Sequence, residues 1–163
     1  MKSIRLKNYD YSSNGSYFIT VCTEKKRCIL GRTVGQGLCS CQLTDIGKIV
    51  ESEIDNIEKR FSGVFIDNYI VMPNHIHLLI SLERQEQSPC PTVGEIICTL
   101  KSITTRKANV VENKKGRKIW QARYYDHVVR NSDDYENIWN YIEYNTAKWN
   151  EDRFFLNELE CKK

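Results

Sequence analysis

The strongest constraint on the fold lies in residues 65–82, where two runs rich in β-branched and aromatic residues are separated only by Pro73 and Asn74. Proline removes a donor from a sheet and asparagine tolerates turn geometry, so this pair predicts a tight hairpin or one long strand interrupted by a bulge. We favour two strands, residues 65–72 and 75–82. An antiparallel pair of strands is therefore the expected centre of the fold.

The second of these strands begins with two histidines, His75 and His77. Because side chains on a strand alternate between its faces, both imidazoles are expected on one face, with Ile76, Leu78 and Ile80 turned into a core on the other. Their Cβ atoms would lie roughly 7 Å apart, which allows both rings to reach one metal ion. Taken alone, the pattern is more typical of two histidines that are hydrogen-bonded within the protein or exposed to solvent than of two metal ligands.

The remaining elements predict a mixed architecture. Residues 16–23 indicate a strand, and Thr44 and Thr92 are expected caps of two helices, one reaching Phe61 and one ending before Gly116. Residues 119–129 suggest a short last strand, and the polar cluster 131–134 precedes a final helix that runs to about residue 150. Residues 31–40 are expected to form a loop or a weak strand pair, and 84–91 a polar loop. This order predicts an α+β fold with helices packed on an antiparallel sheet.

Length and composition set the class of protein. A chain of 163 residues and 19.1 kDa with 40% hydrophobic and 28% charged residues is expected to fold as one globular domain, 1–163. Its apolar stretches are much shorter than the ~20 residues of a membrane-spanning helix, so no membrane association is expected. The first residues lack the apolar centre of a secretory signal, which favours a cytoplasmic location.

Cysteine usage fits that location. The number of cysteines, seven, is odd, and no C-x-x-C pair occurs. A zinc site with two C-x-x-C pairs is therefore not indicated, and we expect reduced thiols at all seven positions.

Positive charge is concentrated in one segment. The chain as a whole has a formal net charge of only +3, but residues 101–118 contain seven Lys or Arg against the single acid Glu112. Such a strip is suited to phosphate contacts, although it is equally compatible with a solvated helix face.

Three motifs together resemble a known family. Tyr141 and Asn145, which are expected to neighbour each other on the last helix, are unremarkable alone. In combination, residues 72–79 (MPNHIHLL), 120–130 (WQARYYDHVVR) and 141–145 (YIEYN) resemble the single-tyrosine transposases named HUH for their His-hydrophobic-His motif. The likeness is greatest to the REP-associated tyrosine transposase branch and spans about residues 5–150, leaving 151–163 as a tail. Thr146 stands where that branch usually has proline after the asparagine.

The resemblance implies a ferredoxin-like α+β fold with helices packed on one face of the sheet, the HUH motif on a central strand and the catalytic tyrosine on a C-terminal helix. It assigns catalysis to Tyr141, His75 and His77, with Tyr141 as nucleophile. It assigns binding of Mg²⁺ or Mn²⁺ to His75, His77 and Asn145. The implied enzyme nicks and rejoins single-stranded DNA beside a hairpin through a 5′-phosphotyrosine intermediate, and members occur as monomers or homodimers.

A phenol with an ordinary pKa near ~10 is a weak nucleophile, so a metal-polarised phosphate is what this chemistry needs. Trp120 and Tyr124 are possible stacking residues that more often belong to a core, and His127 has no assigned role beyond packing or hydrogen bonding. The candidates for DNA contact are Lys101, Arg106, Lys107, Arg117, Lys118 and Arg123.

Three alternatives remain at this point. The chain could be a catalytically inactive, host-adopted nucleic-acid-binding module of the same fold. It could be a phosphoesterase that uses water instead of tyrosine, although the two H-x-[ST] motifs typical of two-histidine phosphoesterases are missing from the sequence. It could also be a scaffold protein in which the motifs occur by accident.

Overall fold

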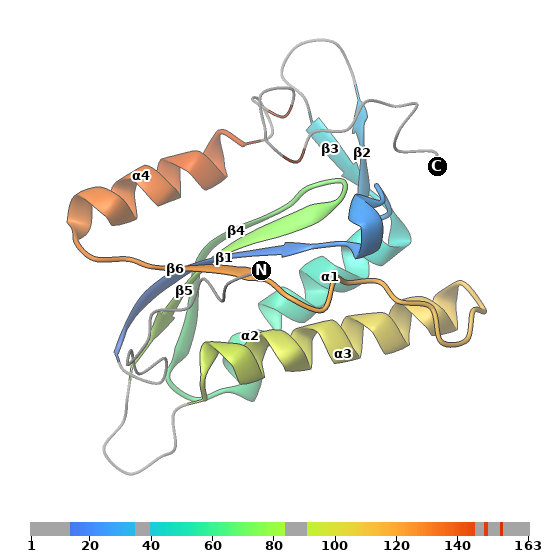
Figure 1. The fold of residues 1–163 in the computed structure, drawn as a ribbon, viewed down its shortest axis with the longest axis horizontal. Coiled ribbons are helices and arrows are strands. Elements are labelled where there is room, and N and C mark those ends of the chain that lie inside the picture. Colours follow the sequence, from blue (N-terminus) through green and yellow to red (C-terminus); the bar gives the residue numbers. More distant parts are fainter. Residues whose placement is uncertain (1–13, 35–39, 84–90, 146–148, 150–153, 155–163) are drawn as a thin grey trace.

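The computed structural model describes residues 14–34, 40–83, 91–145, 149 and 154. Residues 84–90 of the predicted loop 84–91, nearly all of the tail and Cys39, Cys90 and Cys161 lie outside the described residues. Figure 1 shows the arrangement of the elements. In chain order they are β1 (Gly15–Cys22), the 3₁₀ helix η1 (Glu24–Lys26), β2 (Gly31–Val34), β3 (Ser40–Leu43), α1 (Asp45–Asp55), α2 (Ile57–Arg60), β4 (Val64–Val71), β5 (His75–Leu82), α3 (Val93–Val111), β6 (Tyr125–Val128) and α4 (Ser132–Glu143).

A four-stranded antiparallel sheet with the order β4-β5-β1-β6 forms the centre of the fold, and β2 and β3 form a separate pair. The predicted break at Pro73 and Asn74 is a hairpin turn between β4 and β5, in which the Met72 N–H donates to the His75 carbonyl over 2.9 Å. The histidines therefore lie on a central strand, paired with β1 on one side and β4 on the other. This confirms the predicted α+β class and the position of the HUH motif.

The helices begin at the predicted caps. The Thr44 hydroxyl accepts from the Gly47 N–H, and Thr92 forms a reciprocal capping box with Glu95, so both threonines satisfy N–H groups that a first helical turn leaves unpaired. Asn131 caps α4 in the same way by accepting from the Asp134 N–H. The first helix is shorter than predicted, because the chain breaks at Asn56 and continues as the short α2.

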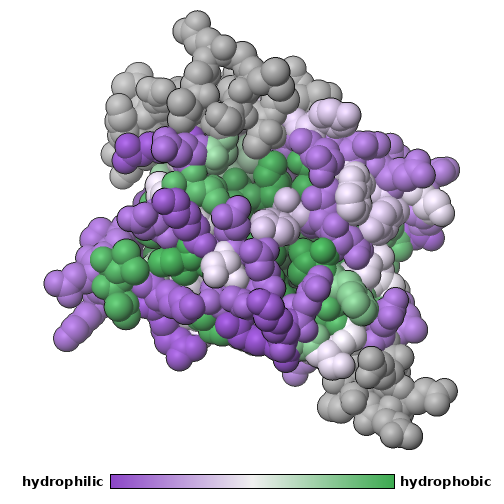
Figure 2. Space-filling view, turned by 180° about the vertical axis from the view of Figure 1, so that it is seen from behind, coloured by the Kyte–Doolittle hydropathy of each residue, from purple (hydrophilic) through white to green (hydrophobic). Residues whose placement is uncertain are grey.

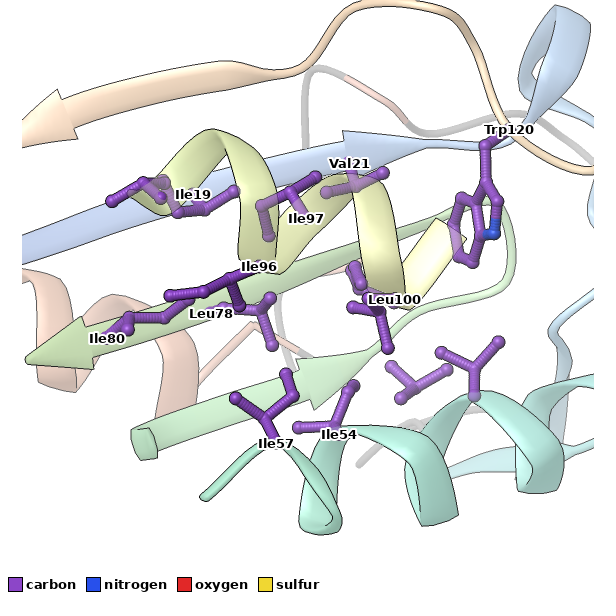
Figure 3. Packing of buried hydrophobic residues seen from close by; sticks show 14 of the residues in the cluster. Ile19, Val21, Ile54, Ile57, Leu78, Ile80, Ile96, Ile97, Leu100 and Trp120 are labelled. Atoms are coloured by element: carbon purple, nitrogen blue, oxygen red, sulfur yellow. The ribbon is translucent and has the colours of Figure 1, made fainter. Parts of the chain in front are cut away.

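The main core lies between one face of the sheet and the pair α1 and α3. Ile19 and Val21 of β1 and Leu78 and Ile80 of β5 point toward aliphatic residues of the helices, as Figure 3 shows. Trp120 closes the end of this core, and its Nε1 donates to the Thr104 hydroxyl over 2.8 Å. Trp120 is therefore a core residue, which was the commoner of the two interpretations, core packing and base stacking, that the sequence allowed. The helix residues of this core seen in Figure 3 are Ile54, Ile57, Ile96, Ile97 and Leu100.

The helix α4 covers the opposite face. Its buried residues Ile138 and Ile142 pack on Phe18 and Leu79, which point away from the main core. In Figure 1 α4 consequently lies on one side of the sheet and α1 and α3 on the other. The prediction of helices on one face holds for α1 and α3, and the structure adds α4 on the second face.

Hydrophilic residues dominate the surface seen from behind, with hydrophobic residues in separate patches among them (Figure 2). Among the described helices, none combines the length and the apolar character that spanning a bilayer requires.

Cys22, Cys41 and Cys98 are reduced, and burial raises the pKa of the Cys41 thiol to about 11. Cys28 is disulfide-bonded, so the expectation of seven reduced thiols is wrong there. A residue count cannot show which two sulfurs the fold brings together.

Candidate active site

The two histidines of β5 form the centre of the candidate site. Both imidazoles lie on the face of the sheet toward α4, and both are fully buried. Their Nε2 atoms are 3.0 Å apart, and the ring centroids are separated by 4.5 Å in an edge arrangement. The prediction that both rings point to one side and converge is confirmed by this contact.

A buried polar side chain faces the other nitrogen of each ring. The Oδ1 atom of Asn74 lies 2.8 Å from Nδ1 of His75, and the Thr20 hydroxyl lies 2.8 Å from Nδ1 of His77. Thr20 reaches His77 because the β1–β5 register pairs these two residues directly. Sequence reasoning did not assign a role to either side chain. The position of Asn74 beside His75 was a usable signal, whereas the strand register could not be derived from sequence.

Tyr141 approaches the histidines from the last turn of α4. Its hydroxyl lies 3.4 Å from Nε2 of His77, and its ring meets the His77 ring at a centroid distance of 5.2 Å and the Phe18 ring at 5.9 Å. The ring is 42% exposed, so it is reachable from solvent while its hydroxyl faces the imidazole pair. The placement follows from the sequence of α4, because Tyr141 comes three residues after the buried Ile138 and so lies beside the helix face that packs on the sheet.

Polar contacts to neighbouring strands hold α4 in position. A register shift in β4 between Ile66 and Asn68 marks the place where the helix is anchored. There the Asn68 amide donates to Glu143 over 3.1 Å, and burial together with the hydrogen bond and charge of Asp67 raises the pKa of Tyr135 to about 12. These contacts lie near both ends of the helix and fix the position of Tyr141 between them.

His127 of β6 supplies a further anchor for α4. Its Nε2 lies 2.8 Å from a carboxylate oxygen of Asp134, in the first turn of the helix. The same oxygen accepts the Arg130 N–H, and the hydrogen bond from His127 is the main cause that lowers the pKa of the Asp134 carboxyl. The third histidine of the chain therefore joins β6 to the start of the helix that carries Tyr141.

Asn145 follows the end of the helix. The prediction placed it with Tyr141 on a helix running to about residue 150, but α4 ends at Glu143, with Tyr144 as its C-cap. The Asn145 N–H donates to the Ile142 carbonyl over 3.3 Å, and the residue is buried at 3% exposure. The predicted helix end is therefore wrong, and Asn145 lies in the turn that directly follows α4.

Aromatic rings enclose the imidazole pair. Phe18 stacks on His77 at 5.1 Å between centroids, and Trp149 and Phe154 lie 5.8 and 4.7 Å from His75. The ammonium of Lys26 lies 5.1 Å from the centroid of the Phe154 ring and brings a positive charge close to this enclosure. The surroundings of the histidines are therefore largely apolar, which strengthens any charge interaction formed there.

The donor set fits a divalent ion. Nitrogen atoms 3.0 Å apart suit neighbouring ligand positions, since these are about 3.0 Å apart in an octahedral site with bonds of about 2.1 Å. The described residues contain no group of three or more His, Cys, Asp or Glu that could hold an ion. Within this part of the chain, amide oxygens are the protein donors left to join the two imidazoles, beside oxygens of water or substrate.

Three residues of the basic strip, Lys101, Arg106 and Lys107, lie on α3, across the sheet from the histidines. Lys101 donates to the carbonyls of Gln121, Ala122 and Arg123 at 2.9–3.4 Å, and burial lowers the pKa of its ammonium to about 8. Lys107 pairs with the buried Glu53 and Arg117 with Glu112. The side chains of this set that are exposed and not engaged in such contacts are Arg106, Lys118 and Arg123.

The site thus consists of two convergent histidines on a strand and a tyrosine on the helix that faces them. Comparisons with known proteins show which family has this chain's sequence and fold. A family model described as "Transposase IS200 like" matches residues 12–145, and the chain therefore belongs to the IS200-like transposase family. The resemblance to transposases inferred from the three motifs is confirmed.

The chain is also similar to a known protein and to two solved structures. An uncharacterized protein of Haemophilus influenzae is 33% identical over 172 residues, which cover 95% of this chain and 93% of the relative. The structure of a REP-associated tyrosine transposase bound to a REP hairpin has a TM-score of 0.58 at 20% identity, covering 91% of this chain and 74% of the other. A candidate transposase from Deinococcus radiodurans R1 has a TM-score of 0.51 at 17% identity, with coverage of 88% and 96%. The two structures support the same fold.

Proposed function

We propose that this transposase cleaves and rejoins single-stranded DNA, with Tyr141 as its nucleophile. The observation that carries the proposal is the Tyr141 hydroxyl, which lies 3.4 Å from Nε2 of His77 within one chain. The histidine pair behind it is fully buried, whereas the tyrosine ring is partly exposed. A phosphodiester approaching past the ring would meet the hydroxyl and the imidazoles together.

His75 and His77 would hold a Mg²⁺ or Mn²⁺ ion, with Asn145 as the proposed third protein ligand. When bound, such an ion polarises a non-bridging phosphate oxygen and offsets the negative charge that develops as the phosphate is attacked. Asn145 is buried and lies just beyond the helix that carries the nucleophile, which supports this role. The apolar rings around the histidines would strengthen the interaction between the ion and the phosphate charge.

The strand-transfer step follows from this arrangement. The phenol of Tyr141 loses its proton to solvent and its oxygen forms a bond to phosphorus, while the bond from phosphorus to the 3′ oxygen breaks. That oxygen takes up a proton, leaving a free 3′-OH and a 5′-phosphotyrosine. Attack by a 3′-OH then releases Tyr141 and restores a phosphodiester, so the bond energy is conserved and no nucleotide cofactor is required.

The proposed DNA substrate contains a hairpin beside the cleaved strand, as in the transposase complex of similar fold. Among the predicted DNA contacts, Arg106, Lys118 and Arg123 have exposed side chains. Arg106 lies on α3, so it would contact DNA on the face opposite the histidines. The nucleophile and both histidines belong to one chain, so a monomer can supply these groups. We place this activity in the cytoplasm.

A covalent-adduct assay tests the proposal. The protein is incubated with Mn²⁺ and a pool of labelled single-stranded hairpins, and denaturing gels are read for a labelled protein band. We expect the adduct with the wild type and its loss in Tyr141→Phe. Tyr144→Phe is the matched control, since Tyr144 follows on the same segment and is 61% exposed, and it should retain the adduct.

Other outcomes favour the alternatives. An adduct that persists in Tyr141→Phe would move the nucleophile elsewhere and refute the assignment. Metal-dependent hydrolysis that is unaffected by Tyr141→Phe would favour the water-using phosphoesterase. Hairpin binding by wild type without any adduct across the pool would favour the inactive binding module.

A further inference from the structure

A continuous chain of hydrogen bonds crosses the histidine pair. It runs from the Phe154 carbonyl to the Asn74 amide (2.9 Å), from Asn74 to Nδ1 of His75 (2.8 Å), between the two Nε2 atoms (3.0 Å) and from Nδ1 of His77 to the Thr20 hydroxyl (2.8 Å). Thr20, Asn74 and both histidines are at most 1% exposed. Protein groups therefore decide where the hydrogens of this chain lie.

The Asn74 end of the chain has a fixed direction. A carbonyl oxygen such as that of Phe154 can only accept, so the amide nitrogen of Asn74 must face it and the amide oxygen must face His75. An amide oxygen also only accepts, which requires a hydrogen on Nδ1 of His75. The neutral imidazole then carries its lone pair on Nε2, the nitrogen that faces His77 and the proposed ion.

The Thr20 end can run in either direction, because a hydroxyl both donates and accepts. The direct contact between the two Nε2 atoms requires one hydrogen between them, and His77 must supply it since His75 presents a lone pair. Nδ1 of His77 then accepts from the Thr20 hydroxyl. An ion held by both Nε2 atoms would replace the shared hydrogen. His77 would lose its proton at Nε2 and gain one at Nδ1, with no change in charge. The Thr20 hydroxyl would then rotate and accept a hydrogen bond from this Nδ1–H.

We propose that Asn74 and Thr20 are positioning residues for metal binding, with different tasks. Asn74 permanently sets His75 in the tautomer that ligates through Nε2. Thr20 permits His77 to change to that tautomer, because its hydroxyl can partner Nδ1 in both forms. The inference rests on the proposed divalent ion at these histidines and extends it to residues that touch neither the ion nor the substrate.

The first test compares Thr20→Val, Thr20→Ser and Thr104→Val by titration with Mn²⁺, followed by electron paramagnetic resonance. We expect Thr20→Val to weaken binding about 10–100-fold, as for other lost partners of a ligating histidine, and Thr20→Ser to restore it. Thr104 is the matched control, since its buried hydroxyl bonds Trp120 on the other side of the sheet. Its valine variant should melt at a lower temperature and bind Mn²⁺ as the wild type does. Equal affinities of Thr20→Val and wild type would overturn the proposal.

Asn74 has its own pair of variants. Asn74→Asp keeps an acceptor for the Nδ1–H of His75, so its affinity for Mn²⁺ should stay within about threefold of wild type. Asn74→Leu removes the acceptor and should weaken binding about 10–100-fold. Comparable binding by the leucine variant and wild type would refute the role of Asn74.

A second readout separates this inference from the proposed function. Long-range ¹H–¹⁵N correlations of the imidazoles, recorded without metal, report each tautomer directly. We expect hydrogen on Nδ1 of His75 and on Nε2 of His77, both in wild type and in Thr20→Val, and a switch of His77 to Nδ1 when a diamagnetic divalent ion is added to wild type. Hydrogen on Nε2 of His75 would overturn the inference even if the Tyr141 adduct forms. Correct tautomers with neither Mn²⁺ binding nor an adduct would instead refute the proposed function.

Discussion

The two faces of the central sheet differ in what they bury. Toward α1 and α3, β5 presents Ile76, Leu78 and Ile80, all fully buried in an aliphatic core. Figure 3 shows Leu78 and Ile80 in this core. Toward α4, the same strand presents His75 and His77 beside a much smaller apolar cluster. A single strand thus serves both faces, because its side chains alternate.

The difference shows how the chain separates stability from chemistry. The aliphatic face can be closely packed because its side chains carry no polar groups that need partners. The histidine face places polar groups in an equally buried position and must satisfy each of them, which Thr20 and Asn74 do. A register slip of one residue in β5 would exchange the two faces, so core packing also fixes the direction of the imidazoles.

The largest expected effect comes from removing a histidine. His77→Gln should reduce adduct formation by about a thousandfold, because the proposed ion loses one of its imidazole ligands. The melting temperature should change little, since glutamine keeps a polar group near Thr20. Adduct rates on a hairpin that wild type cleaves, measured beside thermal melts, check both expectations. Retention of more than a tenth of the wild-type rate would contradict a metal role for His77.

The converse experiment removes volume from the aliphatic face. Ile97 is fully buried on α3, and Ile97→Ala should lower the free energy of unfolding by about 2–5 kcal/mol, through lost apolar contact and the cavity left behind. The adduct rate per folded molecule should remain that of wild type. Urea denaturation measures the first quantity and a gel assay below the melting temperature the second.

Val110→Ala on the same helix is the control, because Val110 is 80% exposed and its loss should change stability by less than about 0.5 kcal/mol. A large drop in adduct rate in Ile97→Ala at full folding would show that the two faces are not separable.

Local features of the molecule were predictable from sequence. The alternation of β5 identified both faces, and Thr44 and Thr92 marked the starts of α1 and α3, because a period of two and a capping side chain act over a few residues. The convergence of His75 and His77 belongs to the same class. Such features depend on neighbours in the chain, which the sequence displays directly.

Features that depend on distant pairing were not predictable. Thr20 contacts His77, 57 residues away in the chain, because the register of β1 and β5 pairs them. The end of α4 at Glu143 was also not predicted. The partner of Lys107 is Glu53, 54 residues away, although the sequence showed only a run of positive charge. The family resemblance supplied the link between β5 and Tyr141 that spacing alone could not.

The ion pair of Glu53 also lies on the side of the sheet that stabilises the fold, and its removal should have a smaller effect on stability than the loss of Ile97. Burial raises the pKa of this carboxyl, but hydrogen bonds and charges from Lys107 and Arg60 outweigh it and leave the pKa below its ordinary 4.5. Glu53→Gln should therefore lower the free energy of unfolding by about 1–3 kcal/mol at neutral pH, with adduct formation unchanged.

The pH dependence of that difference has a definite sign. A carboxyl with a lowered folded-state pKa contributes stability above its ordinary pKa of 4.5 and loses it as the pH falls through the folded value. The gap between wild type and Glu53→Gln in urea denaturation should narrow as the pH falls from neutral to below 4.5. A gap that is constant over this range would show that the charge of Glu53 contributes nothing.

The smallest expected effect lies where β6 meets α4, on the catalytic face. His127 is bonded to Asp134 at 2.8 Å, and both side chains are about one-third exposed, so His127→Gln should cost only about 0.5–1 kcal/mol of unfolding free energy. Because this contact fixes the start of the helix that carries Tyr141, a few-fold decrease in adduct rate should accompany it, while Mn²⁺ affinity stays that of wild type. Chemical denaturation, the gel assay and the Mn²⁺ titration measure the three quantities. A loss of Mn²⁺ affinity would place His127 within the metal site, whereas an unchanged adduct rate would show that the core contacts of Ile138 and Ile142 alone position α4.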